Sequence, residues 1–492
     1  MKDYLIEYNN LISNIKYSKK KFDLSFFSSP TLNKQESITF LYKKILKYIK
    51  NEDSFTPINL KEKFKFIFRI LYHFFFLSII SLLFRVKKVP KNNIYIRTWL
   101  VPRSIKSNNI VDDYFKELVT DLSLKNKVIV AFQHLSYNKL IYYFKKKNKK
   151  KSFIIPIGFL SVYEIFNLLI QYIFQAKIRI DDPIYFKNKK INDVINNSLL
   201  EDYYRCRSLQ AYIDYHIAIK LKKYDPKKIL YVFENQAWEN SYINVFNDSK
   251  TELIGYQSSG FSFRFLNFFP SKIDKKFGLF PDKIFTVGDN YTQNLKKYGN
   301  YPIPIISFGA LRFNHLLKNQ GFKIKNPNLK ILKKILYAFP VHFYQYNNVI
   351  KKLIKIFKNT DIQMYLKFHP LYDINDLKIK LPDNFHIIKS SANLDLNKQF
   401  DIVLFNDNSF GIETLIDGVK SYQFIVDQIY NEDRFINFNI YDPNINIDKL
   451  KILCHKLINN KFDKRLNTIK ILEYIELNYK PYNKKTIDKY II

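Results

Sequence analysis

The chain has 492 residues, a length that corresponds to roughly two to four domains. Hydrophobic residues make up 47% and charged residues 25%, which excludes a chain that is disordered along its whole length. The 80 lysines and arginines exceed the 44 aspartates and glutamates, giving a formal net charge of +36 that favours anionic partners such as nucleic acid, an anionic membrane or anionic substrates.

Two features of the composition limit the kinds of binding site and anionic partner that we expect. Only 10 residues are glycine, so a site made of several glycine-rich phosphate loops is not expected. Lysine far outnumbers arginine, the residue better suited to reading bases, and we expect no specific nucleic-acid partner. The two cysteines lie far apart in helix-like sequence, which is typical of a reducing cytosol, and no secretory signal is seen.

Residues 1–90 are lysine-rich and are predicted to form a helical N-terminal extension that ends in an apolar run. Residues 70–84 of this run read ILYHFFFLSIISLLF and have basic residues on both sides. The run is shorter than the roughly 20 residues that cross a bilayer. We expect a helix in the membrane interface, with a buried core helix and a true span as the alternatives.

From residue 94 onward, short apolar runs alternate with longer helix-like stretches such as 112–124 and 198–224. Apolar strands separated by helices indicate parallel βαβ units, and a break near 310–330 divides them into two halves. We therefore predict an N-terminal Rossmann-like domain at 91–315, a C-terminal one at 325–470 and a tail at 471–492. The expected strands are 94–100, 127–132, 152–157, 229–233, 253–256 and 283–287 in the first domain, and 335–339, 363–368, 385–388, 401–405 and 421–426 in the second.

Ligands of doubly wound sheets bind at the carboxyl ends of the strands, and two such domains facing one another form a cleft there. His369 follows an expected strand, between Lys367 and Pro370, and its imidazole could donate to a phosphate oxygen. A turn histidine bonded to backbone is the alternative. Asn408, Ser409 and Glu413 follow the expected strand 401–405 at a strand-to-helix turn, where helix amides could face an anion or the helix could simply be capped.

The first domain offers carboxylates at a corresponding place. Glu234 and Glu239 follow the expected strand 229–233 in the sequence ENQAWE, and either could remove a proton from an acceptor hydroxyl. We prefer Glu234 because it lies nearer the strand, and an ordinary polar loop is the alternative. Weaker candidates for binding a ligand are Ser258 and Ser259 in GYQSSG. Gly309 and Arg312 near the domain junction, and Arg97 and Arg103 on either side of Trp99, are weaker candidates too.

The sequence has no P-loop, HExxH, GxGxxG or GxSxG motif, and no Asp-x-Asp of the kind that holds magnesium in sugar transferases. A metal-independent transfer is therefore favoured. The ordered segments ENQAWEN, GYQSSGFS, PDKIFTVGDNY, GALRF, KFHP and NDNSFGIETLIDG resemble bacterial GT-B surface-carbohydrate transferases, in the neighbourhood of polysialyltransferases and capsule Kdo transferases. The resemblance covers about residues 94–430.

This resemblance implies a GT-B fold and a CMP-linked sugar-nucleotide co-substrate, with no other cofactor. It implies that His369 contacts the nucleotide phosphate, that Ser409 and its neighbours bind phosphate or sugar carboxylate, and that an acid of the first domain is the base. The sialyltransferase pattern of two acids and a glycine at the base position is replaced here by Glu234-Asn235-Gln236. We expect transfer of a nonulosonic acid or Kdo to a glycan or lipid-linked glycan of capsule or lipopolysaccharide, at the inner face of the cytoplasmic membrane.

The sequence is also compatible with other functions. The donor could be CDP-glycerol, a CDP-polyol or a UDP-sugar. The chain could also be a non-catalytic basic protein that binds a membrane or another polyanion, which would bind with a steep dependence on salt.

Overall fold

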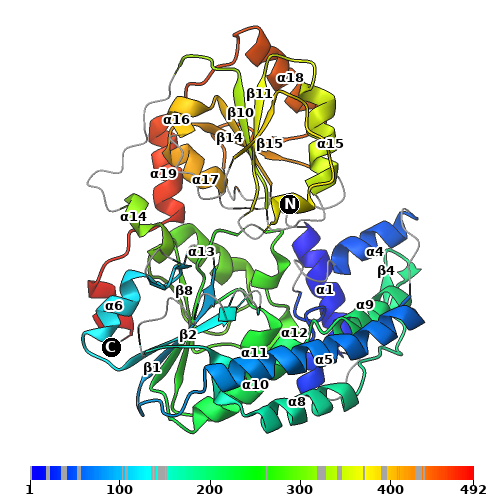
Figure 1. Cartoon of the computed structure of the whole chain (residues 1–492), viewed down its shortest axis with the longest axis vertical. Coiled ribbons are helices and arrows are strands. Elements are labelled where there is room, and N and C mark those ends of the chain that lie inside the picture. Colours follow the sequence, from blue (N-terminus) through cyan, green and yellow to red (C-terminus); the bar gives the residue numbers. More distant parts are fainter. Residues whose placement is uncertain are drawn as a thin grey trace. The chain divides into compact units, whose positions relative to one another are not determined.

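The structure is a computed structural model of the whole chain (Figure 1). It describes all residues except 1–2, 18–22, 35–40, 52–56, 102–103, 106–108, 135–136, 138–139, 142–143, 145–149, 151, 262, 318–328, 341–345, 370–371, 389–395, 407, 409, 427–434, 436–437 and 492. Arg103, Pro370 and Ser409 therefore lie outside the described residues, as does most of the basic run 145–151.

The chain forms two compact units. Unit 1 comprises Met1–Ser258, Phe265–Asn314 and Lys480–Ile492, and unit 2 comprises Ser259–Arg264 and His315–Tyr479. Unit 1 thus takes in the expected N-terminal extension and the last part of the expected tail, which the sequence had suggested as separate segments.

Unit 1 contains a seven-stranded parallel sheet of order β3-β2-β1-β6-β7-β8-β9. The first three strands extend the sheet in one direction and the later ones in the other, so the chain reverses direction between β1 and β6. Such a switch point is where open α/β sheets bind their ligands, at the carboxyl ends of the strands. The strands are β1 (Ile94–Leu100), β2 (Val128–His134), β3 (Phe153–Ile154), β6 (Lys228–Val232), β7 (Glu252–Tyr256), β8 (Lys283–Thr286) and β9 (Ile305–Ser307).

The strands of this sheet are mostly apolar because both faces are covered by other elements. A short antiparallel pair, β4 (Tyr185–Phe186) and β5 (Lys189–Lys190), lies outside the sheet. The helices of unit 1 are α1 (Asp3–Tyr17), α2 (Leu24–Phe27), α4 (Leu41–Ile49), α5 (Leu60–Leu83), α6 (Glu117–Ser123), α8 (Val162–Phe174), α9 (Asn192–Tyr204), α10 (Leu209–Lys222), α11 (Ala237–Phe246), α12 (Lys272–Phe277), α13 (Asp289–Tyr298) and α20 (Lys485–Tyr490), with 3₁₀ turns η2 (Pro156–Phe159), η3 (Leu266–Phe268) and η4 (Leu311–Phe313).

The N-terminal helices pack against the rest of unit 1 through buried polar contacts. The buried Asp202 accepts hydrogen bonds from the Ser29 hydroxyl at 2.7 Å and the Thr31 amide at 2.9 Å. Lys16, itself buried, pairs with Asp274 of α12. Because breaking such contacts would leave buried polar groups unsatisfied, the described residues between 3 and 49 are an integral part of this unit.

The expected helix at 198–224 is two helices, α9 and α10. The chain turns between them, and Cys206 takes a left-handed backbone conformation with φ +55°. The expected strand at 152–157 is also shorter, because β3 stops at Ile154 and Pro156 begins the 3₁₀ turn η2.

Unit 2 contains a six-stranded parallel sheet of order β12-β11-β10-β13-β14-β15, with its switch point between β10 and β13. Alternate residues of β10 enter different cores: Ile335 and Tyr337 pack in the cluster that contains residues of α15 and α18, and Leu336 packs in a second cluster. The strands are β10 (Lys334–Ala338), β11 (Gln363–Lys367), β12 (Phe385–Ile388), β13 (Ile402–Phe405), β14 (Lys420–Phe424) and β15 (Asn444–Ile445), and the helices are α14 (Asn314–Leu317), α15 (Tyr346–Phe357), α16 (Leu396–Gln399), α17 (Phe410–Ile416), α18 (Ile447–Ile458) and α19 (Thr468–Asn478), with the 3₁₀ turn η6 (Ile374–Asp376).

The α/β class with two Rossmann-like units is thus confirmed. The end of the chain returns to unit 1 after α19. There the Lys480 amide donates to the Val287 carbonyl at 2.8 Å, and the Ala310 amide donates to the Lys480 carbonyl at 2.7 Å.

Candidate functional site

The first candidate site lies at the carboxyl end of β6, beside the switch point of the unit 1 sheet. Glu234 comes two residues after the last residue of β6 and is half-buried. The side-chain amide of Gln236 donates a hydrogen bond to its carboxylate. Asn267 holds the backbone of this turn by donating to the Glu234 carbonyl at 2.6 Å. The turn therefore presents a partly accessible carboxylate on a fixed backbone, which is what a general base requires.

Glu239, the second carboxylate that the sequence suggested, has a different position. It is the third residue of α11 and forms a capping box with Gln236. One oxygen, Oε1, accepts from the amides of Glu234 at 2.8 Å and Gln236 at 3.0 Å. The side chain is 1% exposed. This geometry gives Glu239 the role of fixing the loop that carries Glu234, and it offers no route to an acceptor hydroxyl.

Burial also changes the ionisation of Glu239. Desolvation raises its pKa to about 8, with the nearby Glu234 carboxylate acting in the same direction and the two backbone hydrogen bonds opposing it. At neutral pH the group is therefore mostly a neutral acid. Its second oxygen, Oε2, is buried without an acceptor or donor partner, a position that a protonated carboxyl tolerates better than a carboxylate.

A buried cation lies beneath this loop. The Arg97 guanidinium, on β1, lies 3.2 Å from the ring centroid of Trp238 in α11 and 4.5 Å from that of Trp99. Its Nη2 is 3.3 Å from the Asp214 carboxylate, and both side chains are fully buried. The Trp238 indole donates to the Gln236 side chain at 3.0 Å. The pair thus supports the first turn of α11 from the core side, a role that the sequence could not distinguish from ligand binding.

Of the weaker candidates, Ser258, Gly309 and Arg312 belong to unit 1, and Ser259 belongs to unit 2. Ser258 is buried, with 2% of its surface exposed, and Ser259 is half-buried. Gly309 has φ +137°, and a Cβ there would lie 2.9 Å from the Cα of Tyr482. The backbone that approaches Gly309 closely is thus that of the C-terminal segment. Arg312 lies 3.6 Å from Asp113, and its carbonyl accepts a hydrogen bond from Lys116.

The second candidate site lies at the carboxyl ends of β10 and β11 in unit 2. β11 ends at Lys367, and the half-buried His369 follows two residues later. The hydroxyl of Tyr346 donates to the Pro340 carbonyl after β10, and the backbone of His369 hydrogen-bonds to that same hydroxyl. A buried tyrosine thus joins the two strand exits and fixes the position of His369.

Four aromatic rings pack together at the carboxyl ends of β10 and β11. Phe339 and Phe368, which follow β10 and β11 directly, stack with centroids 4.8 Å apart and an interplanar angle of 14°. Tyr346 and Tyr372 pack against them at 4.5–5.6 Å between centroids. Such packing restricts the backbone on both sides of the histidine. Tyr346 is the first residue of α15 and was not among the candidates that the sequence indicated.

Asn408 lies at the switch point of the unit 2 sheet. Its side-chain amide donates to the carbonyl of Ala338, the last residue of β10, at 2.9 Å, and its Oδ1 accepts from the Phe410 amide at 3.0 Å. The side chain predicted to bind the donor is thus used to join β10 to the turn after β13. Glu413 is half-buried in the first turn of α17, as expected. Within the described residues, no group of three or more His, Cys, Asp or Glu side chains could hold a metal ion.

Comparisons with known proteins find structural likeness only. No protein-family model and no curated protein matches the chain. Among solved structures, Staphylococcus aureus MnaA with UDP is 12% identical and has a TM-score of 0.42, covering 81% of this chain and 96% of its own. UDP-GlcNAc 2-epimerase from Neisseria meningitidis bound to UDP-GlcNAc is 12% identical with a TM-score of 0.43, covering 81% and 98%. A variant of the wall teichoic acid polymerase TagF is 13% identical with a TM-score of 0.36, covering 88% and 96%.

All three scores lie below 0.5. The assignment of two Rossmann-like units therefore depends on this chain's own strand order.

Proposed function

We propose that this protein is a glycosyltransferase of bacterial surface-polysaccharide synthesis. In this proposal it transfers an acidic sugar, of the nonulosonic acid or Kdo type, from a CMP-linked donor to a glycan or lipid-linked glycan, without a metal ion. Unit 1 binds the acceptor and unit 2 binds the donor. In this proposal, residues of both units act on the same donor–acceptor pair, as the GT-B resemblance implies.

One observation supports the proposal most strongly. Each Rossmann-like unit presents a half-buried, chemically capable side chain just past the carboxyl end of a strand at or next to its switch point, Glu234 after β6 and His369 after β11. In each unit a separate set of buried residues fixes the backbone that carries this side chain. Strand exits at switch points are the usual ligand sites of such sheets, and fixed turns are expected where reacting groups must be positioned.

In the proposed reaction, the acceptor hydroxyl oxygen attacks the anomeric carbon of the donor sugar while the bond to the phosphate oxygen breaks. Glu234 accepts the hydroxyl proton, and the nucleotide leaves with the bonding electron pair on its phosphate. His369 donates a hydrogen bond to that phosphate and so stabilises the charge that develops on it. Glu239 takes no proton, because it already holds one at neutral pH.

Release of the nucleotide tests the proposal and separates it from its alternatives. The wild-type chain is incubated with CMP-, CDP- and UDP-linked donors and a glycan acceptor, and the released nucleotide is identified. We expect CMP release that falls by at least ~10² in Glu234→Gln and in His369→Ala, with Glu239→Gln as the matched control that stays active. Release of CDP or UDP instead would assign a CDP-glycerol, CDP-polyol or UDP-sugar transferase.

Thermal-shift measurements with the free nucleotides provide an independent readout, since a nucleotide that binds only the folded state raises the melting temperature. Stabilisation by CMP alone supports the CMP-linked donor. If no nucleotide stabilises the chain and every polyanion binds with a steep salt dependence that His369→Ala leaves unchanged, the protein is a basic polyanion-binding protein and the enzymatic proposal is wrong.

A further inference from the structure

Helices α5 and α8 together carry a large exposed apolar surface. The two helices pack side by side in unit 1 (Figure 1). Phe74 of α5 contacts Phe166 of α8 with ring centroids 6.0 Å apart. Phe68 is 71% exposed and Phe174 is 79% exposed. We call this set the α5–α8 surface; its exposed members are Leu60, Phe64, Ile67, Phe68, Leu71, Tyr72 and Phe75 of α5 and Tyr163, Phe166, Ile170 and Phe174 of α8.

The spacing of these residues shows that each helix contributes one continuous face. On α8 the exposed apolar residues recur every three or four positions, and on α5 they recur in the same way from residue 60 to residue 75. The opposite face of α5 is buried through residues such as Phe66, Ile70, Leu77 and Ile80. Eleven large exposed apolar side chains on two neighbouring helices exceed the scattered exposure of ordinary surfaces, and such patches mark interaction sites.

The charges around the surface are mainly positive. Lys61, Lys63 and Lys65 are exposed at the start of α5, and Arg85, Lys87 and Lys88 follow its end. The acids of the two helices are Glu62 and Glu164, and both are paired with cations: Glu62 with Lys65 at 3.1 Å and Arg69 at 3.0 Å, and Glu164 with Lys220. An apolar face bordered by lysine and arginine complements the acyl chains and the phosphates of an anionic lipid leaflet.

The attachment of α5 determines how it can meet a membrane. By length and composition α5 is the one described helix that could cross a bilayer. It is, however, fixed to unit 1 near both ends. Just before its start, the Ile58 amide donates to the Asn197 side chain of α9 at 2.9 Å, and within the helix Arg69 donates to the Tyr204 carbonyl at 2.9 Å. At its end, Ser81 donates to the Leu160 carbonyl, and the Val86 amide donates to the Gly158 carbonyl at 2.9 Å.

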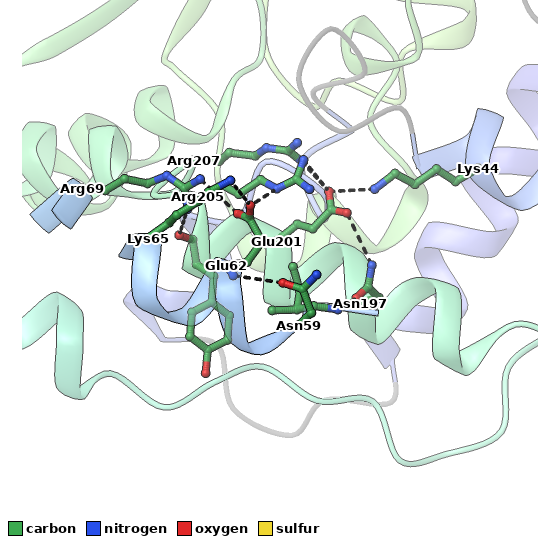
Figure 2. A network of polar contacts seen from close by, with 11 residues as sticks. Lys44, Asn59, Glu62, Lys65, Arg69, Asn197, Glu201, Arg205 and Arg207 are labelled. Atoms are coloured by element: carbon green, nitrogen blue, oxygen red, sulfur yellow. Dashed lines mark hydrogen bonds and ion pairs between the residues drawn. The ribbon is translucent and has the colours of Figure 1, made fainter. Parts of the chain in front are cut away.

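Figure 2 shows the network that fixes the start of α5 to α9. Glu62 of α5 and Glu201 of α9 are joined through Arg205, which lies 3.8 Å from each carboxylate. A helix that crossed a bilayer would have to leave this network and expose its buried apolar face. The further members of the network are Lys44, Asn59, Lys65, Arg69, Asn197 and Arg207.

We propose that the α5–α8 surface docks into one leaflet of an anionic phospholipid membrane, with both helices lying parallel to the membrane plane at the boundary of headgroups and acyl chains. The proposal extends the interfacial helix expected at 70–84: the lipid-facing part of α5 begins ten residues earlier, and α8 shares it. It does not depend on the glycosyltransferase proposal, because vesicle binding needs neither donor nor acceptor.

Flotation of the full chain with vesicles tests the docking. We expect the wild type to float with phosphatidylcholine vesicles that contain 30% phosphatidylglycerol, and to bind pure phosphatidylcholine at least tenfold more weakly. Phe68→Glu combined with Phe174→Glu should reduce binding to the anionic vesicles at least tenfold at an unchanged melting temperature. The matched control is Leu124→Glu, a similarly exposed leucine (67%) elsewhere in unit 1, which should bind like the wild type.

Two outcomes would overturn the proposal. One is unchanged binding of the folded double variant. The other is a wild type that ignores vesicles but forms a dimer that the double variant abolishes, which would assign the surface to a second copy of the chain.

Quenching of introduced tryptophans by brominated lipids tests the orientation. Phe68→Trp, Phe75→Trp and Phe174→Trp are compared with the wild type, whose signal from its two tryptophans is subtracted. Phe68 and Phe75 are two turns apart, about 10 Å along the helix axis. For helices in the membrane plane, shallow bromines should quench all three positions more than deep ones do. Unequal depths at 68 and 75, with no quenching at 174, would instead show that α5 crosses the bilayer.

Discussion

The substitution Glu239→Gln tests whether the buried carboxyl of the β6–α11 loop is neutral. In the folded protein its pKa is raised from 4.5 to about 8, mainly because burial disfavours the charged form. Between these two values the folded chain keeps a proton that the unfolded chain has released. The free energy of unfolding therefore falls as pH rises through this window, by about 1.4 kcal/mol per pH unit, and becomes level above about pH 8. Glutamine holds no such proton and removes this slope.

Three other groups with shifted pKa values affect the free energy of unfolding at lower pH. Burial raises the pKa of Asp112 and of Asp202 to about 6, so their contributions have the same sign but are complete by about pH 7. Burial lowers the pKa of His73 to about 4, which makes stability rise with pH between about 4 and 6.5. All three groups are present in both proteins, and their contributions cancel in the difference between wild type and variant.

The assay is urea unfolding of both proteins, followed by far-ultraviolet circular dichroism from pH 6 to pH 9. Between pH 6 and pH 7.5, the wild-type free energy of unfolding should lose about 2 kcal/mol relative to Glu239→Gln. At pH 6 the two should differ little, because the amide oxygen can still accept the Glu234 and Gln236 amides. Parallel profiles across the whole range would show that Glu239 is ionised in the folded state, and would return it to consideration as the base.

Two further substitutions test packing that the structure describes. Gly309→Ala should destabilise unit 1 by ~2 kcal/mol or more, because Gly309 has φ +137° and the added methyl meets the Tyr482 backbone. The control Gly278→Ala, at φ +65° in open space, should cost about 1 kcal/mol. Equal melting temperatures of the two variants would contradict this difference. Asp214→Asn should cost about 3–5 kcal/mol in chemical unfolding, since it leaves Arg97 buried without its counter-ion; a loss below 1 kcal/mol would show that the pair is dispensable.

Regular apolar patterns made much of the fold predictable. The strand expected at 94–100 matches β1, and the expected strands of unit 2 match β10 to β14 to within one or two residues. These strands are covered on both faces, so their sequences are continuous apolar runs that stand out from the helices. Short edge strands such as β9 and β15 were missed, because two or three residues carry too little pattern.

The sequence contains a signal for the true start of α5. Hydropathy alone placed a helix at 70–84, whereas the helix begins at Leu60. Asn59 followed by Glu62 is a helix-start pattern, and the periodic apolar residues after it continue into the run.

The roles of the two glutamates after β6 could be predicted from the sequence only in part. The pattern Gln236-x-x-Glu239 is a capping box that can be recognised in the sequence. Because a capping box engages the Glu239 carboxyl, it favours Glu234 as the accessible acid. Burial of Arg97 against two tryptophans depends on residues from β1, α10 and α11, which are far apart in sequence. The structural role of Asn408 likewise depends on its hydrogen bond to the Ala338 carbonyl, 70 residues away in the sequence.

The return of residues 480–492 to unit 1 has a consequence for synthesis of the protein. During translation, the N-terminal sheet leaves the ribosome well before the segment that pairs with Val287 and packs against Gly309. The part of unit 1 around Val287 and Gly309 therefore stays uncovered while the whole of unit 2 is synthesised and folds. A ribosome that stalls within unit 2 would release a chain whose earlier half cannot be finished, and chaperones are expected to recognise that half through its exposed apolar groups.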